Sequence, residues 1–122
     1  MKCLPPVLVC GLSFSAVILV FAQDPVKVSP QYYNVLIDND ELRVLEYHLK
    51  PGEKEPMHSH PRGFVYALSD AKFKISFPDG RTEETVMKEG EAHWREPVTH
   101  AAENIGNSEA HAIAVELKKS RR

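Results

Sequence analysis

Almost every segment of the chain after residue 31 has the hydrophobic pattern of a β-strand, either alternating or as a short apolar run. The clearest case is residues 72–77, in which Phe73, Ile75 and Phe77 alternate with polar residues. Because strand side chains point alternately to two faces, this period of two predicts a half-buried strand. Asp79-Gly80 is a pair typical of hairpin turns. Similar patterns predict further strands over residues 32–37, 42–49, 64–68, 82–88, 92–95, 99–104 and 110–117.

No segment shows a helical spacing of apolar residues over a useful length. The short predicted strands instead follow one another at regular spacing, separated by turns such as Pro51-Gly52. This organisation is typical of a β-sandwich or a β-barrel. Residues 24–31 contain Pro25 and Pro30 and are expected to form an extended arm before the first strand. The sequence therefore predicts an all-β fold with a single domain.

The beginning of the chain has a different character. Residues 4–21 are almost continuously apolar, and Val20 and Ala22 stand where signal peptidase accepts small or short side chains. This pattern predicts a secretory signal peptide over residues 1–22 and a mature domain over residues 23–122. A retained membrane anchor is the alternative, because the apolar run is about as long as the shortest membrane spans, roughly 17 residues. Cleavage would give a secreted or periplasmic protein with no membrane segment.

Charge and cysteine content narrow the function classes. The whole chain has a formal net charge of −2 at pH 7, whereas nucleic-acid binding needs a basic face. Both cysteines, Cys3 and Cys10, lie in the predicted signal peptide. The mature domain is therefore expected to bind no nucleic acid, to contain no disulfide and to use no thiolate as a metal ligand.

The chain contains six histidines, and the pair in His58-Ser59-His60 is the most informative. On a strand, residues i and i+2 point to the same face, so two imidazoles would stand side by side. A third ligand must come from another strand, and His100, which begins a predicted strand, is the best candidate. The sequence therefore predicts a mononuclear metal site at His58, His60 and His100, which would also be the catalytic centre of a metal enzyme.

The other three histidines are expected outside this site. His48 shares a strand face with Glu46 and is expected at the surface. His111 lies on an apolar face of the last strand and is expected in the core or at its rim. His93 precedes Trp94; it could support a metal ligand from behind, although a surface position is the simpler expectation.

The spacing of these residues resembles a known family. Gly52 is followed after five residues by His58, then by His60, and His100 is followed after three residues by Asn104. Over nearly all of residues 32–117 the chain resembles the cupin superfamily. The resemblance implies a double-stranded β-helix, or jelly-roll barrel, that binds one divalent metal ion inside its mouth. It also implies a homodimer, because exposed cupin sheets commonly pair.

Two departures from the cupin motifs bear on the chemistry. The motif's glutamate is expected about four residues after the second histidine, where this chain has Phe64 and then Val65. Arg95 and Pro97 stand where the second motif has proline and glycine. Without the carboxylate the site would be all imidazole, a ligand set that suits copper, zinc and iron better than manganese. An exported protein also meets little reduced iron, so copper is ranked first, iron or zinc second and manganese third.

Aromatic and basic residues near the motifs are candidates for substrate binding. Phe64, Tyr66 and Trp94 would face or flank the mouth of a cupin barrel, where aromatic faces can stack on sugars or apolar substrates. A purely structural role in packing is the alternative. Arg62 and Arg95 could hold an anionic or carboxylate-bearing substrate.

Three functions remain open from the sequence. The first is a secreted copper-dependent oxidoreductase that cleaves a cellulose-like glycan oxidatively, since the domain is similar to small exported cupins that include copper-dependent polysaccharide oxidases. The second is an iron, zinc or manganese cupin enzyme, a dioxygenase or an isomerase, with a small organic substrate. The third is a non-enzymatic metal- or ligand-binding module. A barrel shared by many reactions does not decide between them.

Overall fold

The computed structural model describes residues 2–5, 11 and 23–119. The predicted signal peptide, residues 1–22, lies almost entirely outside the described residues, so export and cleavage stay predictions. Among the described residues, no helix is both long enough and apolar enough to cross a membrane.

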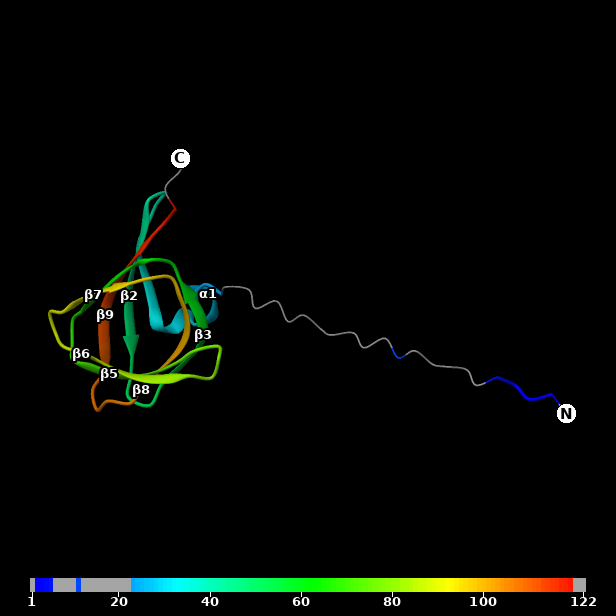
Figure 1. The fold of residues 1–122 in the computed structure, drawn as a ribbon. Helices are drawn as coiled ribbons and strands as arrows, with labels where there is room; N and C mark the ends of the chain where they lie inside the picture. Colours follow the sequence, from blue (N-terminus) through cyan, green and yellow to red (C-terminus); the bar gives the residue numbers. More distant parts are fainter. Residues whose placement is uncertain (1, 6–10, 12–22, 120–122) are drawn as a thin grey trace.

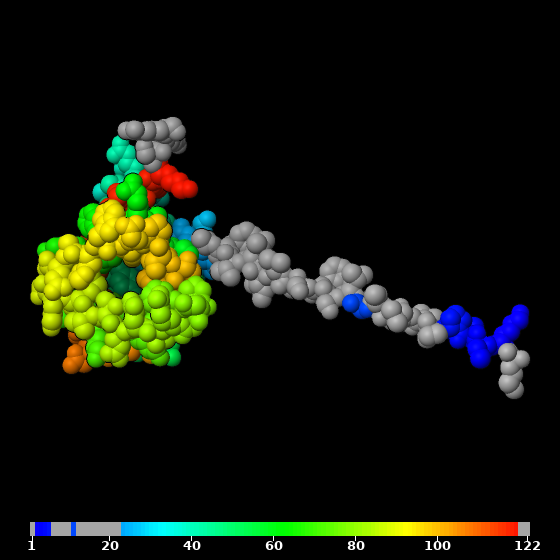
Figure 2. All heavy atoms as spheres, in the orientation of Figure 1, coloured from blue at the N-terminus to red at the C-terminus, as the bar shows by residue number. Residues whose placement is uncertain are grey.

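Antiparallel strands make up most of the domain. Their pairing gives a five-stranded sheet of order β1-β2-β9-β4-β7 and a four-stranded sheet of order β3-β8-β5-β6. Figure 1 shows the strands wrapped into a barrel, and Figure 2 shows that the barrel is hollowed at one end. The predicted all-β jelly-roll barrel is confirmed. Within residues 23–119 the strands are β1 (Tyr33–Asp38), β2 (Leu42–Leu49), β3 (Lys54–His60), β4 (Gly63–Ala67), β5 (Ala71–Ser76), β6 (Thr82–Met87), β7 (Ala92–Arg95), β8 (Val98–Asn104) and β9 (Ala110–Leu117).

The hairpin between β5 and β6 forms as its sequence predicts. Phe73 is buried on the inner face of β5, and the lysines on either side of it are exposed. Gly80 in the turn has a φ of +87°, a conformation that glycine adopts without steric penalty. The period of two and the Asp-Gly turn therefore locate this hairpin correctly.

The segment before β1 differs from the predicted extended arm. It forms a short helix, α1 (Pro25–Val28), followed by a 3₁₀ turn, η1 (Pro30–Tyr32). The Asp24 side chain accepts a hydrogen bond of 2.9 Å from the Val26 N–H and so caps the helix. Pro25 occupies the first helical position, where its fixed φ favours a helix and its missing N–H is harmless. The prediction of an extended arm is wrong because Asp24 caps the helix and both prolines stand in the first turn, where proline favours a helical start.

Strand β9 turns its small side chains inward. Ala110, Ala112 and Ala114 are buried on the inner face, together with Glu116. The larger residues of β9, such as Ile113, lie half-buried on the outer face of the sheet. Alanines on the inner wall leave space inside the barrel, and this space becomes the cavity that contains the candidate site.

The hydrophobic core surrounds this cavity instead of filling the barrel. It consists of two clusters, one built around Leu49, Phe73 and Met87 and the other around Tyr33 and Leu45. Tyr33, Phe73 and Met87 also line the cavity. The cavity therefore has partly apolar walls, which favours the organic part of a bound molecule.

Candidate metal centre

Two neighbouring strands bring the three predicted histidines together. His58 and His60 lie two residues apart on β3, and His58 is the direct cross-strand partner of His100 on β8. The pairing is reinforced by a hydrogen bond of 2.6 Å between the Ser59 and Thr99 hydroxyls. The strand alternation and the register thus place three imidazoles on one inner face, as the sequence predicts.

The three imidazole rings form a compact group. Their ring centroids are 4.6 Å apart for His58 and His60, 4.8 Å for His58 and His100, and 5.2 Å for His60 and His100. One nitrogen from each ring lies within 4.8 Å of the others. A ligand–metal bond to imidazole is about 2.0–2.1 Å long, so adjustments of less than about 1 Å would place all three on one ion.

The site combines burial with access to a cavity. His58 is 1% exposed and His60 is 6% exposed, whereas His100 is partly buried. All three line a cavity of about 500 Å³. The ligands are therefore shielded from bulk water on one side and face a space large enough for a small organic molecule on the other.

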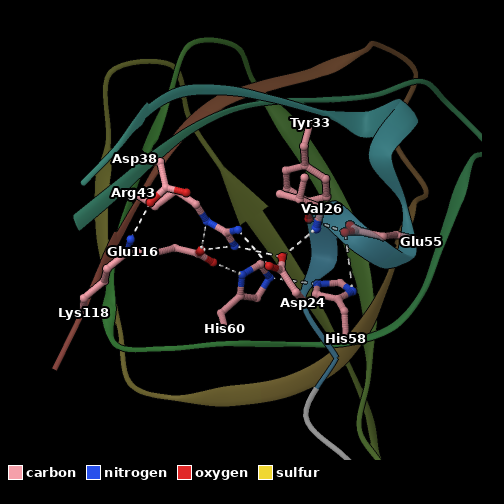
Figure 3. A network of polar contacts seen from close by, with 10 residues as sticks. All are labelled: Asp24, Val26, Tyr33, Asp38, Arg43, Glu55, His58, His60, Glu116 and Lys118. Atoms are coloured by element: carbon pink, nitrogen blue, oxygen red, sulfur yellow. Dashed lines mark hydrogen bonds and ion pairs between the residues drawn. The ribbon is translucent and has the colours of Figure 1, made fainter. Parts of the chain in front are cut away.

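Hydrogen bonds fix the orientation of two of the rings, and Figure 3 shows the one between His60 and Glu116. Nδ1 of His60 lies 2.8 Å from a Glu116 carboxylate oxygen, and Nδ1 of His58 lies 2.7 Å from the Pro56 carbonyl oxygen. If each Nδ1 carries the proton and donates it to these oxygens, each Nε2 keeps a free lone pair. The two Nε2 atoms are 2.8 Å apart, so both point to the same place. Partners of this kind commonly orient metal-binding histidines.

The electrostatics of the site favour neutral imidazoles. Burial, opposed by the hydrogen bond to Glu116, lowers the pKa of His60 to about 4. Burial and repulsion from His60 and His58 lower the pKa of His100 to about 3. Only the neutral form of imidazole has the lone pair that a metal ion needs. At neutral pH these two side chains are therefore ready to act as ligands.

Glu116 is itself part of a longer network. Arg43 donates two hydrogen bonds to Glu116, of 3.0 and 2.6 Å, and two to Asp24, of 2.8 and 2.9 Å. Burial raises the pKa of Glu116, but hydrogen bonds from His60 and Arg43 outweigh it and hold the pKa below its ordinary value. The N-terminal helix cap is thus connected through Arg43 and Glu116 to a histidine of the site (Figure 3).

A second buried carboxylate lies behind His58. Glu55 is 2% exposed, accepts hydrogen bonds from the hydroxyls of Tyr33 and Tyr47, and lies 3.4 Å from Nδ1 of His58. Burial raises the pKa of Glu55. Glu55 therefore contacts His58 on the Nδ1 side, away from the Nε2 atom that points to the other rings.

Sequence reasoning missed both glutamates, for different reasons. Glu55 is an odd number of residues before His58, and strict alternation would put the two on opposite faces. The β3–β8 register shifts between Glu55 and His58, and this irregularity brings both side chains inward. Glu116 contacts His60 across 56 residues of sequence. The sequence contains only a weak indication of this contact. Glu116 is a single acidic residue that shares one face of β9 with three alanines.

The aromatic candidates are not all at the mouth. Phe64 and Tyr66 are exposed and do not line the cavity; alternation along β4 turns Val65 inward instead. This corrects their predicted position, and it places Val65 at the inward-facing position where the glutamate of the cupin motif was expected. Trp94 does line the cavity and is 57% exposed, so it lies at the opening.

The two arginine candidates for substrate binding lie in different places. Arg62 is exposed and lies outside the cavity lining, whereas Arg95 lines the cavity. Within the described part of the chain, Nε and Nη2 of Arg95 are buried without a hydrogen-bond partner. Burial lowers the pKa of Arg95. A buried guanidinium with unsatisfied donors beside three imidazoles is suited to bind an anionic group.

Comparisons with known proteins support the fold. No protein-family model and no curated protein matches the chain. Among solved structures, a cupin-domain protein from Bordetella pertussis Tohama I is 25% identical, with a TM-score of 0.65 over 71% of this chain and 92% of that chain. An RmlC-like cupin with a double-stranded β-helix fold from Methanocaldococcus jannaschii is 15% identical, with a TM-score of 0.56 over 70% and 77%.

A third solved structure in the comparison is an enzyme. The polyketide cyclase RemF from Streptomyces resistomycificus is 24% identical, with a TM-score of 0.52 over 71% of this chain and 64% of that chain. Together these likenesses show that the chain has the single-domain cupin fold. The likeness to the Bordetella cupin-domain protein, at 25% identity, also supports a relation to the cupin superfamily. With the histidine cluster, these likenesses support a metal-binding protein of the cupin type.

Proposed function

We propose that this cupin barrel binds one transition-metal ion at His58, His60 and His100 and is an enzyme for a small anionic organic substrate. The observation that carries the proposal is that Nε and Nη2 of Arg95, a residue lining the same cavity as the three imidazoles, are buried without a hydrogen-bond partner. Copper remains the first-ranked ion, iron or zinc the second and manganese the third, because an all-imidazole ligand set disfavours manganese and an exported protein would meet little reduced iron. The ion would supply Lewis-acid or redox chemistry beside the bound substrate.

Each part of the cavity has a role in this proposal. Arg95 binds a carboxylate or a similar anionic group of the substrate through its free N–H donors. Apolar wall residues such as Phe73 and Met87 contact the organic part and exclude water. Glu116 holds His60 in the orientation and tautomer that present Nε2 to the ion.

Copper-dependent oxidation of a glycan is a second candidate function. The exposed indole of Trp94 at the opening favours it, because an aromatic face can stack on a sugar ring. In this case the polymer would lie across the opening, and only the reacting bond would approach the ion.

Elemental analysis of protein purified without added metal, followed by assays with small carboxylates and with cellulose, tests both candidates. We expect about one tightly bound transition ion and turnover of a small carboxylate. His60→Ala should lose turnover. Oxidised products released from cellulose alone would favour the second candidate. If the wild-type and His60→Ala proteins both bind a carboxylate but neither turns it over, the enzyme proposal fails. The protein would then be a non-enzymatic binding module.

Replacing Arg95 by methionine tests the anion site. Hydrogen bonds to charged groups contribute about 1.5–3 kcal/mol, so KM for the carboxylate substrate should rise roughly 10- to 100-fold. Steady-state kinetics measures the change. Arg62→Met is the matched control, because it removes an exposed arginine outside the cavity lining and should leave KM unchanged. Equal KM values for the two variants would contradict an anion site at Arg95.

The homodimer stays a prediction, and the apolar side chains on the outer surface indicate which face would form the dimer interface. Exposed apolar side chains on the outer face of the five-stranded sheet include Ile37, Phe64 and Tyr66. We propose that this face pairs with a second copy of the chain. We also propose, from the predicted signal peptide, that the protein is secreted or periplasmic. Light scattering on a size-exclusion column should give the mass of a dimer, and Phe64→Glu should give a monomer. A monomeric wild-type protein at micromolar concentration would contradict the dimer.

A further inference from the structure

A second group of ligating side chains lies on the outer face of the five-stranded sheet. His48 on β2 is the direct cross-strand partner of His111 on β9, and Glu46 precedes His48 by two residues on the same face. Strands β2 and β9 lie side by side in Figure 1. The two imidazole rings are stacked, with centroids 4.1 Å apart and an angle of 15° between their planes.

The polar atoms of this outer group converge on one carboxylate oxygen. Nε2 of His111 is 2.9 Å and Nε2 of His48 is 3.7 Å from the same oxygen, Oε2 of Glu46. One ligating atom from each of the three side chains lies within 4.8 Å of the others. Ligand atoms on a tetrahedral ion with bonds of about 2.0–2.2 Å are about 3.3–3.6 Å apart. The two measured distances bracket that separation.

Two further side chains hold the outer group in place. Nδ1 of His48 is 2.7 Å from a carboxylate oxygen of Glu109, so a proton on Nδ1 donated to Glu109 leaves the lone pair of Nε2 free. The Asn34 side-chain amide donates to the other oxygen of Glu46 at 3.3 Å. Supporting hydrogen bonds of this kind are a regular feature of metal sites built from histidine and carboxylate.

We propose that Glu46, His48 and His111 form a second metal site, for a divalent ion of the zinc class. Two imidazoles and one carboxylate suit zinc or copper, and a fourth position stays open to water. In a single protomer the histidine side chains are 40% and 32% exposed, so an ion can enter from solvent. The site lies on the same outer face that is proposed to pair with a second copy, so the dimer would cover it at least in part. The ligands come from both β2 and β9, so a bound ion cross-links the middle of the sheet. This site shares no residue with the cavity site.

Zinc titration of metal-stripped protein by isothermal calorimetry tests the second site. Wild-type protein should bind two equivalents, and His60→Ala, which disables the cavity site, should retain one. Adding His48→Gln or His111→Gln to His60→Ala should remove the remaining equivalent. Glu109→Gln in the same background should weaken zinc binding about 10- to 100-fold, as supporting partners do elsewhere.

The matched control is His93→Gln. His93 forms a comparable exposed pair at the rim of the cavity, with Nε2 2.8 Å from a Glu91 oxygen, but it belongs to neither histidine cluster and no third ligating side chain joins it within the described residues. This variant should bind zinc as wild type does. A folded His60→Ala protein that binds no zinc would overturn the outer site. If wild type binds one equivalent that His111→Gln removes and His60→Ala retains, the outer site stands and the cavity site fails.

Discussion

Replacing Gly63 with alanine is expected to destabilise the barrel by about 3 kcal/mol or more. A Cβ atom at Gly63 would lie 1.9 Å from the carbonyl oxygen of Val115 and 3.3 Å from Cα of Glu116. Both contacts are with backbone of the neighbouring strand, which cannot rotate away as a flexible side chain can. Overpacking normally lowers the free energy of unfolding by about 1–3 kcal/mol. Because the Cβ atom would overlap the backbone so closely, we expect a loss at or above the upper end of this range.

The position of Gly63 makes the effect global. Gly63 is paired with Glu116 at the start of the β4–β9 ladder, and β4 and β7 are held to the five-stranded sheet through that ladder. To relieve the clash, β4 must separate from β9 at this end. Because Glu116 also contacts His60, the same movement should weaken metal binding at the cavity site.

Urea denaturation compares Gly63→Ala with Gly52→Ala as its control. Gly52 has a φ of +80°, and a Cβ atom added there would meet no atom within 4 Å, so alanine brings only backbone strain, about 1–2 kcal/mol. We expect Gly63→Ala to lose clearly more stability than Gly52→Ala. Equal losses would show that the ladder accommodates a methyl group and that the close approach of β4 to β9 does not limit stability.

The sequence was a good guide wherever a short-range pattern decides the structure. The residue range predicted for the second strand matches β2, and the Asp-Gly turn correctly joins β5 to β6. The His58 and His60 pair faces inward because alternation on a strand depends only on local backbone geometry. His100 was chosen because it begins a predicted strand, the cupin-like spacing supported that choice, and its place opposite His58 follows from the β3–β8 register.

The residues that sequence analysis misplaced depend on irregular or long-range structure. A register shift turns Glu55 toward the cavity, against the alternation that His58 would predict. Phe64 was placed at the mouth by motif spacing, yet the pairing of β4 with β9 turns Val65 inward. Arg95 and Arg62 were equivalent candidates in the sequence. Only the barrel shows that one of them is buried in the cavity without sufficient partners.

Replacing Arg43 with methionine is expected to cost about 3 kcal/mol of stability and to weaken metal binding at the cavity site. The Glu116 side chain is 3% exposed, and Arg43 is the cation that compensates its charge. Removing one partner of a buried ion pair leaves the other charge uncompensated, which typically costs about 3–5 kcal/mol. Methionine keeps most of the side-chain volume, so the loss reports on charge and hydrogen bonds more than on packing.

The loss of stability should depend on pH in a defined direction. A hydrogen bond from Arg43, opposed by burial, lowers the pKa of Asp24 below its ordinary value of 3.8. A lowered folded-state pKa contributes stability that is present above the ordinary pKa and is lost as the pH falls through the lowered value. The difference in unfolding free energy between wild type and Arg43→Met should therefore be largest near neutral pH and should shrink in acid.

The effect on the metal site follows from the position of Glu116 between Arg43 and His60. Without Arg43, the Glu116 carboxylate loses two hydrogen bonds and is free to leave Nδ1 of His60. Loss of such an orienting partner typically weakens metal binding about 10- to 100-fold. The double variant Arg43→Met with Glu116→Gln should regain part of the stability, because the uncompensated charge of Glu116 is gone, but it should not regain metal affinity. If Arg43→Met bound metal as tightly as wild type while losing stability, the network would stabilise the barrel without positioning His60.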